Sequence, residues 1–521
     1  MGSTGGYRLA GRLDDCMGAQ VTMGRIQSAT PISPLFRTGA RPGGRRRALR
    51  ERPAAGLLGL IGWAALLGVL GSVFLICAGA AGAPNTFVPA RSGGWPGWLA
   101  GPLSGLGMRL TDTRFQVFTI ALCASFALLL VAARSLPLRA IAATIVLAHV
   151  ILLLGPPLLS QDVFGYLAFA RMGALHGLDP YTRLPSEAPT DAVFGFIGWP
   201  FQHSPYGPLF TLASYAAAPL GAAGGLWAFK AVAVLSSLAG VALISQAAAM
   251  LGHSRRFAAV FVGANPVLLL MAVGGAHNDT LILLALGVAL VLSAAARPAM
   301  RAAAVAVAGG VGVKLTAGLL LPFLALAPAR SRERAGVAVA GGLGLLVVAV
   351  VGLAGFGVHA VGFLGAVGEQ QQLIATHSIP AETARLAGLA GVPAWWRDLF
   401  AGLFVVVAAL CLRASARGGD WRTAAGWCTL ALLLCTAWLL PWYGLWLLPL
   451  AAVSGDRRLR GATLAFCAYA VLIHLSLADP LLSPRPPHPS RHLPFPVPGA
   501  RNRLELAGFQ ILRDAQLYLR W

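Results

Sequence analysis

Long apolar runs recur along this sequence from Ala54 to Ala478, and they restrict the possible folds more than any other feature. A run of roughly 20 apolar residues crosses a bilayer as a helix, and in lipid its backbone groups must find partners within the protein. Hydrophobic residues make up 57% of the 521 residues and charged residues only 11%, whereas soluble domains carry about 25% charged residues. The sequence therefore predicts an all-α, polytopic membrane protein with about 11–13 spans, some short or re-entrant.

Arginine-rich short loops separate many of the apolar runs, and such loops stay on the cytoplasmic side. The stretch 302–329 lies between two of them and is too short for two spans, so we expect a helical hairpin that dips into the membrane, with Lys314 near its tip. The stretch 423–454 must go out and return, which predicts one span and a half-helix broken at Pro441. The stretch 207–222 is apolar but short, and the sequence leaves its structure open. The clearest spans are expected near 55–80, 116–133, 140–159, 226–251, 257–275, 280–296, 335–356, 398–414, 423–440 and 460–478.

Three regions follow from this pattern. Residues 1–53 are expected to form a disordered, basic cytoplasmic tail, residues 54–478 the transmembrane domain, and residues 479–521 a Pro-rich, basic tail with a possible amphipathic helix. The loops 160–206 and 357–397 are predicted to face outward from the plasma membrane. The net charge of +22 gathers at span ends and in the tails, where it sets topology and binds membrane lipids. No recognition motif accompanies it, so we expect no nucleic-acid partner.

The seven cysteines indicate neither a disulfide framework nor a metal centre. Most lie inside apolar runs, and none forms a CxxC pair. We interpret them as small buried hydrophobic residues.

Acidic residues are rare enough in the apolar region for their positions to matter. Asp162, Asp279 and Asp398 lie within or at the outer ends of helices, and an ionisable group at membrane depth is a functional candidate by default. Asp162 follows a proline pair and shares a helix face with Tyr166, four residues later. A carboxylate there could accept a proton from an incoming hydroxyl, or it could simply cap a helix.

A second polar cluster reads Gly274-Gly275-Ala276-His277-Asn278-Asp279 at the outer end of a span. It offers donors, acceptors and a group that titrates near neutral pH. The alternative is that Asn278 or Asp279 caps the next helix.

Lys230 and Lys314 are the only lysines in the chain. Lys314, at the tip of a hairpin, suits a phosphate contact, or it could snorkel to lipid headgroups. For Lys230, near a span end, snorkelling is the favoured interpretation. Pro441-Trp442-Tyr443, with Trp446, could form an interfacial aromatic belt or a wall that stacks on carbohydrate.

Taken together, these segments resemble the polyprenol-phosphate-mannose-dependent α-(1→6)-mannopyranosyltransferases of actinobacterial cell-envelope glycans, membrane-embedded enzymes of the C-type glycosyltransferase superfamily. In the superfamily the catalytic carboxylate usually follows the first helix, whereas Asp162 follows the third predicted one, so two extra N-terminal helices are required. The matching stretches, in the family's order, are Asp162–Tyr166, Gly177–Tyr181, Ser204–Pro208, His277–Asp279, Lys314 with Pro322, and Pro441–Trp446.

The resemblance implies an inverting transfer of mannose from polyprenyl phosphate mannose to a glycolipid or α-(1→6)-mannan type acceptor on the outer face. Asp162 would be the catalytic base. The phosphate leaving group needs positive charge more than protonation, and Lys314 and His277 are the candidates for that role. The implied substrate-binding residues are Tyr166, Tyr206, His277, Asn278, Asp279, Lys314, Trp442 and Tyr443. We expect no cofactor and no tightly held metal ion, since Asp162 has no second carboxylate close to it in sequence.

Two other functions stay open at this point. A sibling enzyme of the same superfamily could transfer arabinose or another lipid-phosphate-linked sugar. A transporter or lipid flippase would also use broken helices and an intramembrane lysine, but such folds usually contain an internal repeat, and none is evident here.

Overall fold

The computed structural model describes residues 43–473 and residue 475. The chain divides into two units, Met1–Pro53 and Ala54–Trp521, and the second unit carries the helix bundle. Its described residues form α-helices, short 3-10 helices and one π-helical segment, without strands, which confirms the all-helical membrane fold.

The first half of the fold consists of α1 (Gly43–Ala81), α2 (Gly97–Ala100), α3 (Asp112–Ala132), α4 (Leu138–Leu154), α5 (Asp162–His176), α6 (Pro208–Ser214), α7 (Gly221–Met250), α8 (Arg255–Gly263) and the π-helical segment η7 (Val267–Val273). The second half consists of α9 (Asp279–Ala294), α10 (Met300–Val311), α11 (Leu321–Leu326), α12 (Ser331–Phe356), α13 (Gly362–Gln371), α14 (Ile379–Leu386), α15 (Ala394–Ala416), α16 (Trp421–Cys435), α17 (Gly444–Val453) and α18 (Arg457–Leu472). The 3-10 turns are η1 (Arg91–Gly93), η2 (Pro102–Leu106), η3 (Ala133–Ser135), η4 (Pro185–Glu187), η5 (Phe194–Phe196), η6 (Tyr215–Leu220), η8 (Leu315–Leu320), η9 (Gly357–Val361) and η10 (Pro441–Tyr443).

Five described helical segments are long and apolar enough to cross a bilayer, and the bent pair α8 and η7 would make a sixth. The five are Gly56–Ala81, Asp112–Ser135, Pro208–Met250, Ser331–Gln371 and Ala394–Ala416. Further apolar helices are 10–17 residues long, among them α4, α9 and α10. The stretch 207–222, left open by the sequence, forms α6 and η6 and continues into α7.

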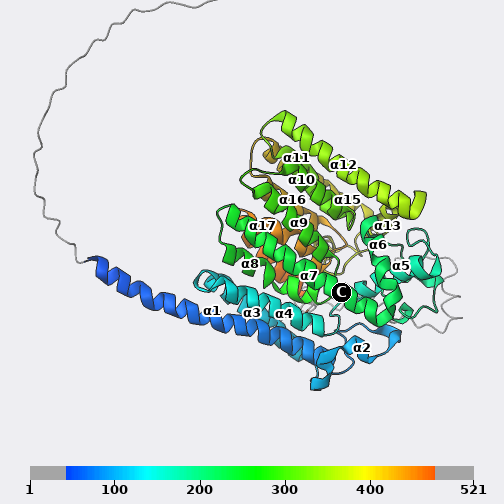
Figure 1. Cartoon of the computed structure of the whole chain (residues 1–521), viewed down its shortest axis with the longest axis horizontal. Coiled ribbons are helices and arrows are strands. Elements are labelled where there is room, and N and C mark those ends of the chain that lie inside the picture. The colour runs from blue at the N-terminus through cyan, green and yellow to red at the C-terminus, as the bar shows by residue number, and fades with distance from the viewer. Residues whose placement is uncertain (1–42, 474, 476–521) are drawn as a thin grey trace, which may run out of the picture. The chain divides into compact units, whose positions relative to one another are not determined.

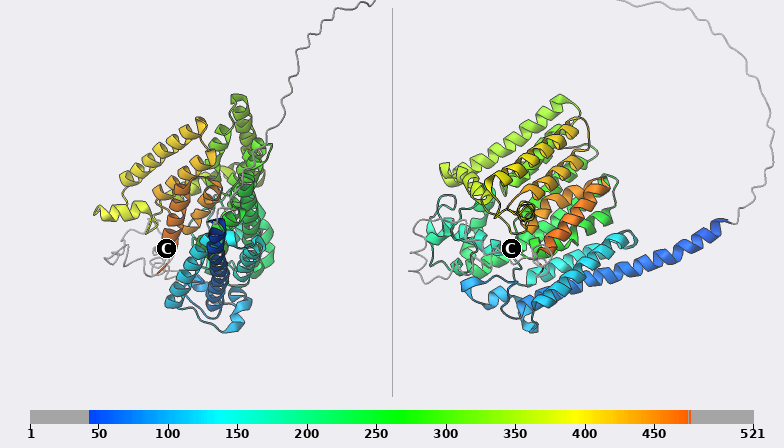
Figure 2. Two further views of the ribbon diagram at one scale, coloured as in Figure 1. Left: turned by 90° about the vertical axis from the view of Figure 1, so that its left-hand side faces the viewer. Right: turned by 180° about the vertical axis from the view of Figure 1, so that it is seen from behind.

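The long connections gather at one end of the helix bundle. In Figure 1, α2, α5, α6 and α13 lie at the right-hand end of the helices, and the reversed view in Figure 2 places the same segments at the left. Arginine-bearing turns meet at the opposite ends of these helices. Arg256 donates to the carbonyl of Arg134 (2.8 Å), and Arg422 donates to the carbonyl of Ser293 (3.2 Å).

Two irregularities predicted from the sequence are confirmed. Between α10 and η8 the chain turns at Lys314, so 302–329 is a hairpin of short helices. Between α16 and α17 it breaks before Pro441, as expected for a half-helix. That the hairpin dips into the membrane stays a prediction.

The predicted span 257–275 is wrong as a continuous helix, because α8 and η7 meet at an angle of 44°. Pro266 has no N–H group to continue the helical ladder, and the Asn265 side chain accepts from the backbone N–H of Val267 (3.0 Å). π-Helical segments of this kind occur frequently at functional sites.

Other boundaries also differ from the expected ones. The span expected at 140–159 ends at Leu154, because Gly155 precedes the proline pair. Helix α1 begins at Gly43, inside the segment 1–53 that was expected to be a tail. The predicted C-terminal tail, 479–521, lies outside the described residues. Of the cysteines in the described part, Cys77, Cys428 and Cys467 are buried and Cys123, Cys411 and Cys435 are partly buried.

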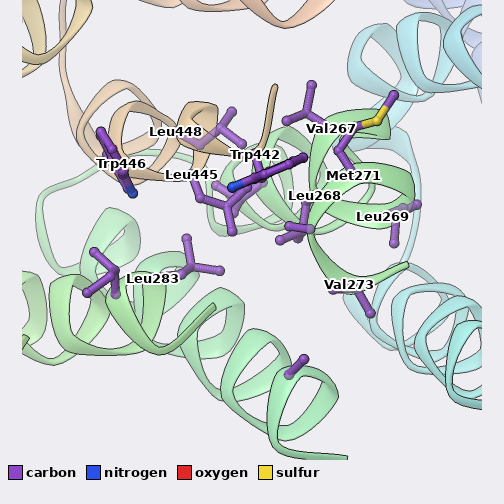
Figure 3. Close-up of a cluster of buried hydrophobic side chains, with 14 of the residues drawn as sticks. Val267, Leu268, Leu269, Met271, Val273, Leu283, Trp442, Leu445, Trp446 and Leu448 are labelled. Carbon is purple, nitrogen blue, oxygen red and sulfur yellow. The ribbon is translucent and has the colours of Figure 1, made fainter. Parts of the chain in front are cut away.

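A dense apolar core lies beside the broken helices. Figure 3 shows side chains of η7, α9 and the η10–α17 segment gathered around Trp442. Val267, Leu268, Leu283 and Leu445 are fully buried there. This core fixes the positions of two predicted motifs, the polar cluster that follows η7 and the aromatic segment that begins at η10.

Candidate active site

A pocket opens where the loops gather, and it encloses about 1120 Å³, counting the space open to solvent. Its walls carry the aromatic side chains of Trp199, Tyr206, Trp438, Trp442 and Tyr443. Its polar side chains include Gln161, Asp162, Gln202, His203, Lys314 and Gln370. Asp162 is the only carboxylate among the described residues that line it.

Asp162 is the first residue of α5, and its side chain does not cap that helix. The capping interpretation of Asp162 is therefore wrong. Its Oδ2 atom lies 3.4 Å from Nδ1 of His277, and the Asp162 side chain is 16% exposed while that of His277 is fully buried. The carboxylate thus has one edge against the protein and the other toward the pocket.

Tyr166 lies on the same face of α5, as its spacing predicted. Its side chain is buried, with 1% exposed. The Tyr166 hydroxyl donates to Oδ1 of Asn278 (3.3 Å) and accepts from the Asn278 backbone N–H (3.3 Å). The hydroxyl is also 3.5 Å from Nδ1 of His277. Tyr166 therefore joins the two motifs that the sequence singled out, which are more than 100 residues apart.

His277 is enclosed rather than exposed to the pocket. Its ring stacks on Trp442 with centroids 3.7 Å apart, and its Nε2 has no hydrogen-bond partner among the described residues. Because His277 does not line the pocket, its role as a direct phosphate contact loses support, and its contact with Asp162 becomes the relevant one.

The backbone on both sides of this contact is strained. Leu159 and Ala276 have φ values of 62° and 55°, a left-handed conformation that is costly for residues with a side chain. Hydrogen bonds hold the Leu159 segment in place, from Leu158 N–H to the Gly274 carbonyl (2.9 Å) and from Leu159 N–H to the Phe87 carbonyl (2.7 Å). Such strain persists only where the surrounding structure imposes it, and it concentrates at functional sites.

Asp279 belongs to a buried ion pair. Asn278 precedes α9 without a side-chain capping bond, and the Asp279 carboxylate, which is fully buried, lies 3.0 and 3.1 Å from Nζ of Lys314. Trp446 Nε1 donates to the same carboxylate (2.7 Å). The capping interpretation of Asp279 and the snorkelling interpretation of Lys314 are both wrong.

The aromatic cluster after Pro441 is part of the site and does not form an interfacial belt. Trp442, Tyr443 and Trp446 are only 6–7% exposed. Tyr443 and Trp446 stack on each other (4.2 Å), and the ammonium of Lys314 lies 4.7 Å from the Tyr443 ring centroid. Rings that surround an ammonium stabilise it by cation–π attraction.

The segment Ser204–Pro208 is fastened to the Lys314 turn. Gly207 N–H donates to the carbonyl of Val313 (2.9 Å), and a Cβ on Gly207 would lie 2.4 Å from the Gly312 carbonyl oxygen, so only glycine fits. Tyr206 meets the Tyr166 ring edge-on, with centroids 4.9 Å apart. Tyr181, from the Gly177–Tyr181 motif, donates to the Tyr206 carbonyl (2.9 Å).

Lys230 lies in the bundle interior and does not snorkel. It is 1% exposed and donates to the carbonyl of Gly155, at the end of α4. The snorkelling interpretation is wrong because the partner of the ammonium is a backbone carbonyl inside the protein. Lys230 therefore supports the segment that leads to Asp162.

Several lining residues were missed by sequence reasoning. His203 Nδ1 lies 2.8 Å from Glu369 of α13, and Trp199 meets Trp438 edge-on at 5.6 Å. Each pair joins loops far apart in the chain, so no local pattern could have revealed it.

Asp191 joins α5 to the loop that follows this helix. Its carboxylate accepts from Nε of Arg171 (2.9 Å) and lies 2.6 Å from Nε2 of His176. Burial alone would raise the pKa of Asp191, but the hydrogen bonds from Arg171, His176 and Val193 N–H lower it below its usual 3.8.

Within 43–473, the side chains of His, Cys, Asp and Glu form no group of three or more that could hold a metal ion. The polar groups of the pocket are one carboxylate, one ammonium, one imidazole, hydroxyls, amides and indoles. This set suits hydroxyl groups and an anion. Two of its groups can take a proton, the Asp162 carboxylate and the imidazole of His203, and His203 is already paired with Glu369.

The comparisons with known proteins agree with this chemistry. Residues 65–330 match the family model described as alpha-(1->6)-mannopyranosyltransferase, N-terminal domain. Alpha-(1->6)-mannopyranosyltransferase A of Mycobacterium tuberculosis is 28% identical over 62% of this chain and 66% of its own length. The protein of the same name from Corynebacterium glutamicum is 29% identical over 33% of this chain and 36% of its own length. The match thus spans about two thirds or less of these relatives. No solved structure matches the chain significantly.

Proposed function

We propose, from the premise that this chain belongs to the alpha-(1->6)-mannopyranosyltransferase family, that it is an inverting glycosyltransferase. The donor is polyprenyl phosphate mannose, and the acceptor is an α-(1→6)-mannan type glycan or glycolipid outside the plasma membrane. The observation that carries the proposal is the pocket, in which Asp162 is the only carboxylate among the described lining residues.

A single carboxylate suits this reaction because only one proton transfer is needed. Asp162 takes the proton from the acceptor hydroxyl as that oxygen attacks the anomeric carbon. The bond to the phosphate breaks on the opposite face, which inverts the configuration, and the phosphate leaves as an anion. Asp279, the acid of the His277–Asp279 motif, is held by Lys314 and Trp446, so it is a poor candidate for the base.

His277 and Lys314 have different tasks in this proposal. The buried imidazole of His277 orients the Asp162 carboxylate, and the hydroxyl of Tyr166, which lies 3.5 Å from Nδ1 of His277, helps to hold that imidazole in place. Lys314 lines the pocket. An ammonium carries three N–H donors. Two of those of Lys314 are used by the Asp279 carboxylate, which leaves one for a phosphate oxygen. Tyr206, Trp442 and Tyr443 supply apolar faces on which a sugar ring stacks.

The difference between the two ends of the helix bundle supports an outward position of the site. Arginine turns gather at one end and the pocket loops at the other, and arginine-rich turns are retained in the cytoplasm. A pocket at the outer ends of apolar helices suits a donor whose prenyl chain stays in the bilayer.

The test is transfer by purified protein from radiolabelled polyprenyl phosphate mannose to a short α-(1→6)-mannan. Asp162→Asn keeps the shape of the side chain but removes the base, so we expect the rate to fall by about 10²–10⁴ with donor binding retained. Asp398→Asn, at an exposed position in α15, is the matched control. Near-normal transfer by Asp162→Asn would contradict the proposal.

A parallel reaction with polyprenyl phosphate arabinose separates the mannosyl enzyme from its sibling. Transfer of arabinose in preference to mannose would replace the donor but keep the mechanism. If neither sugar moves while the lipid crosses liposome membranes, a flippase is the better description.

A further inference from the structure

Gln161, the residue before Asp162, carries an unsatisfied hydrogen-bond donor at the pocket wall. Its side chain lines the pocket and is 2% exposed. Its Oε1 accepts from Nε of Arg91 (3.0 Å), but its Nε2 has no hydrogen-bond partner in the part of the chain that the structure describes. The mechanism proposed above gives Gln161 no task.

The contact with Arg91 determines which end of the amide is available. A guanidinium has donors only, so the amide oxygen must face Arg91 and the NH₂ group must face away from it. Space for this arrangement comes from Gly198, where a Cβ would lie 2.8 Å from Oε1. Arg91 itself has a φ of 44°, a strained conformation that the packing of η1 imposes.

We propose that Gln161 binds a phosphate oxygen of the lipid-linked donor through Nε2, and that Arg91 is a positioning residue that fixes the amide for this contact. The inference rests on the proposed function. A buried amide NH₂ lacks an acceptor, and a phosphate monoester or diester presents only acceptors. The guanidinium adjoining Oε1 adds positive potential, which favours an anionic oxygen over a neutral sugar hydroxyl.

The place of Gln161 in the chain fits this role. Consecutive residues at a helix start do not face each other, so Gln161 and Asp162 can approach the donor sugar from different sides. Asp162 then takes the proton of the attacking hydroxyl while Gln161 holds the departing phosphate.

The test compares binding of polyprenyl monophosphate and of neutral polyprenol to the full chain in nanodiscs. Gln161→Glu can still accept from Arg91, so the fold is retained, but it places a carboxylate oxygen where the NH₂ group was. We expect Kd for the monophosphate to rise on the order of tenfold or more, with Kd for polyprenol unchanged. Gln161→Leu should show a smaller loss.

Gln372→Glu is a matched control. Gln372 also accepts from an arginine, Nη1 of Arg397 (3.1 Å), but it is exposed and does not line the pocket. Its Kd for the monophosphate should equal that of the unaltered chain. Arg91→Met tests the positioning role. As a single variant it should raise Kd for the monophosphate, but combined with Gln161→Leu it should raise Kd little beyond the value for Gln161→Leu alone.

Each outcome decides something. An unchanged Kd for the monophosphate in Gln161→Glu overturns the inference. A raised KM for the mannan acceptor with an unchanged donor Kd overturns it too, because Nε2 would then face a sugar hydroxyl. Equal losses from Arg91→Met in both backgrounds would mean that Arg91 binds the phosphate directly. If the chain binds monophosphate through Gln161 but transfers no sugar, the proposed function fails while this contact stands.

Discussion

Replacement of Lys314 by methionine would leave the Asp279 carboxylate as an uncompensated charge in the protein interior. Asp279 is fully buried, and both of its oxygens lie within 3.1 Å of the Lys314 ammonium. After the change, Trp446 is the one side chain in the described part of the chain that still donates to this carboxylate. Breaking a buried ion pair by removing one partner costs about 3–5 kcal/mol, because the other charge stays buried.

The two ends of the pair differ in exposure, so the two single variants should differ in stability. The Lys314 side chain is 14% exposed and the Asp279 side chain 0%. In Asp279→Asn the ammonium still reaches the pocket, and the amide oxygen can still accept from Trp446. We therefore expect Lys314→Met to be the more destabilising change, and the double variant Lys314→Met with Asp279→Leu to recover most of the loss.

Unfolding of the purified protein in detergent, followed by fluorescence, measures this directly. A loss of about 3–5 kcal/mol should lower the apparent unfolding temperature by roughly 5–10 °C. Arg332→Met, at an exposed position in α12, should leave it unchanged. If Lys314→Met unfolds at the same temperature as the unaltered chain, the Asp279 carboxylate does not need the Lys314 ammonium for stability, and the reasoning is refuted. Reduced use of the donor by a stable Lys314→Met protein would then assign Lys314 to phosphate binding alone.

Two further predictions concern the loops. Because the pKa of Asp191 is lowered below 3.8 in the folded chain, its stabilising contribution is complete above that value and is lost as pH falls through the folded pKa. The unfolding temperature should therefore fall more steeply below about pH 4 in the unaltered chain than in Asp191→Asn, and equal slopes would count against this role. For topology, a membrane-impermeant maleimide added outside cells should label Thr190→Cys but not Arg332→Cys, both exposed. The reverse pattern would place the pocket inside the cell.

The fold class could be predicted from the sequence because lipid permits few alternatives. Long apolar runs must be helical unless a barrel closes, and a short stretch between two arginine turns must return on itself, as α10 and η8 do. The break at Pro266 was missed because proline is tolerated within membrane helices. Only the packed structure determines whether such a proline bends the helix or ends it.

The candidate site was predictable to the extent that its residues form local motifs. Asp162, Tyr166 and His277 were selected from short segments, and the structure brings them into contact. The partners of buried cations were not predictable. Lys230 binds a backbone carbonyl, which every residue possesses, so no sequence pattern marks it. The pairing of Gln161 with Arg91 depends in the same way on how two distant loops pack.

The low burial of α15 has a consequence for how sequences of this kind diverge. Only 6% of the apolar window of α15 is buried within the protein. Acyl chains accept any apolar side chain of ordinary size, so exchanges among leucine, valine, isoleucine and phenylalanine on this helix are close to neutral and accumulate with time. The matched family region ends at residue 330, before both α12 and α15. We therefore expect identity to relatives to be lower along α15 than along the buried helices of the core.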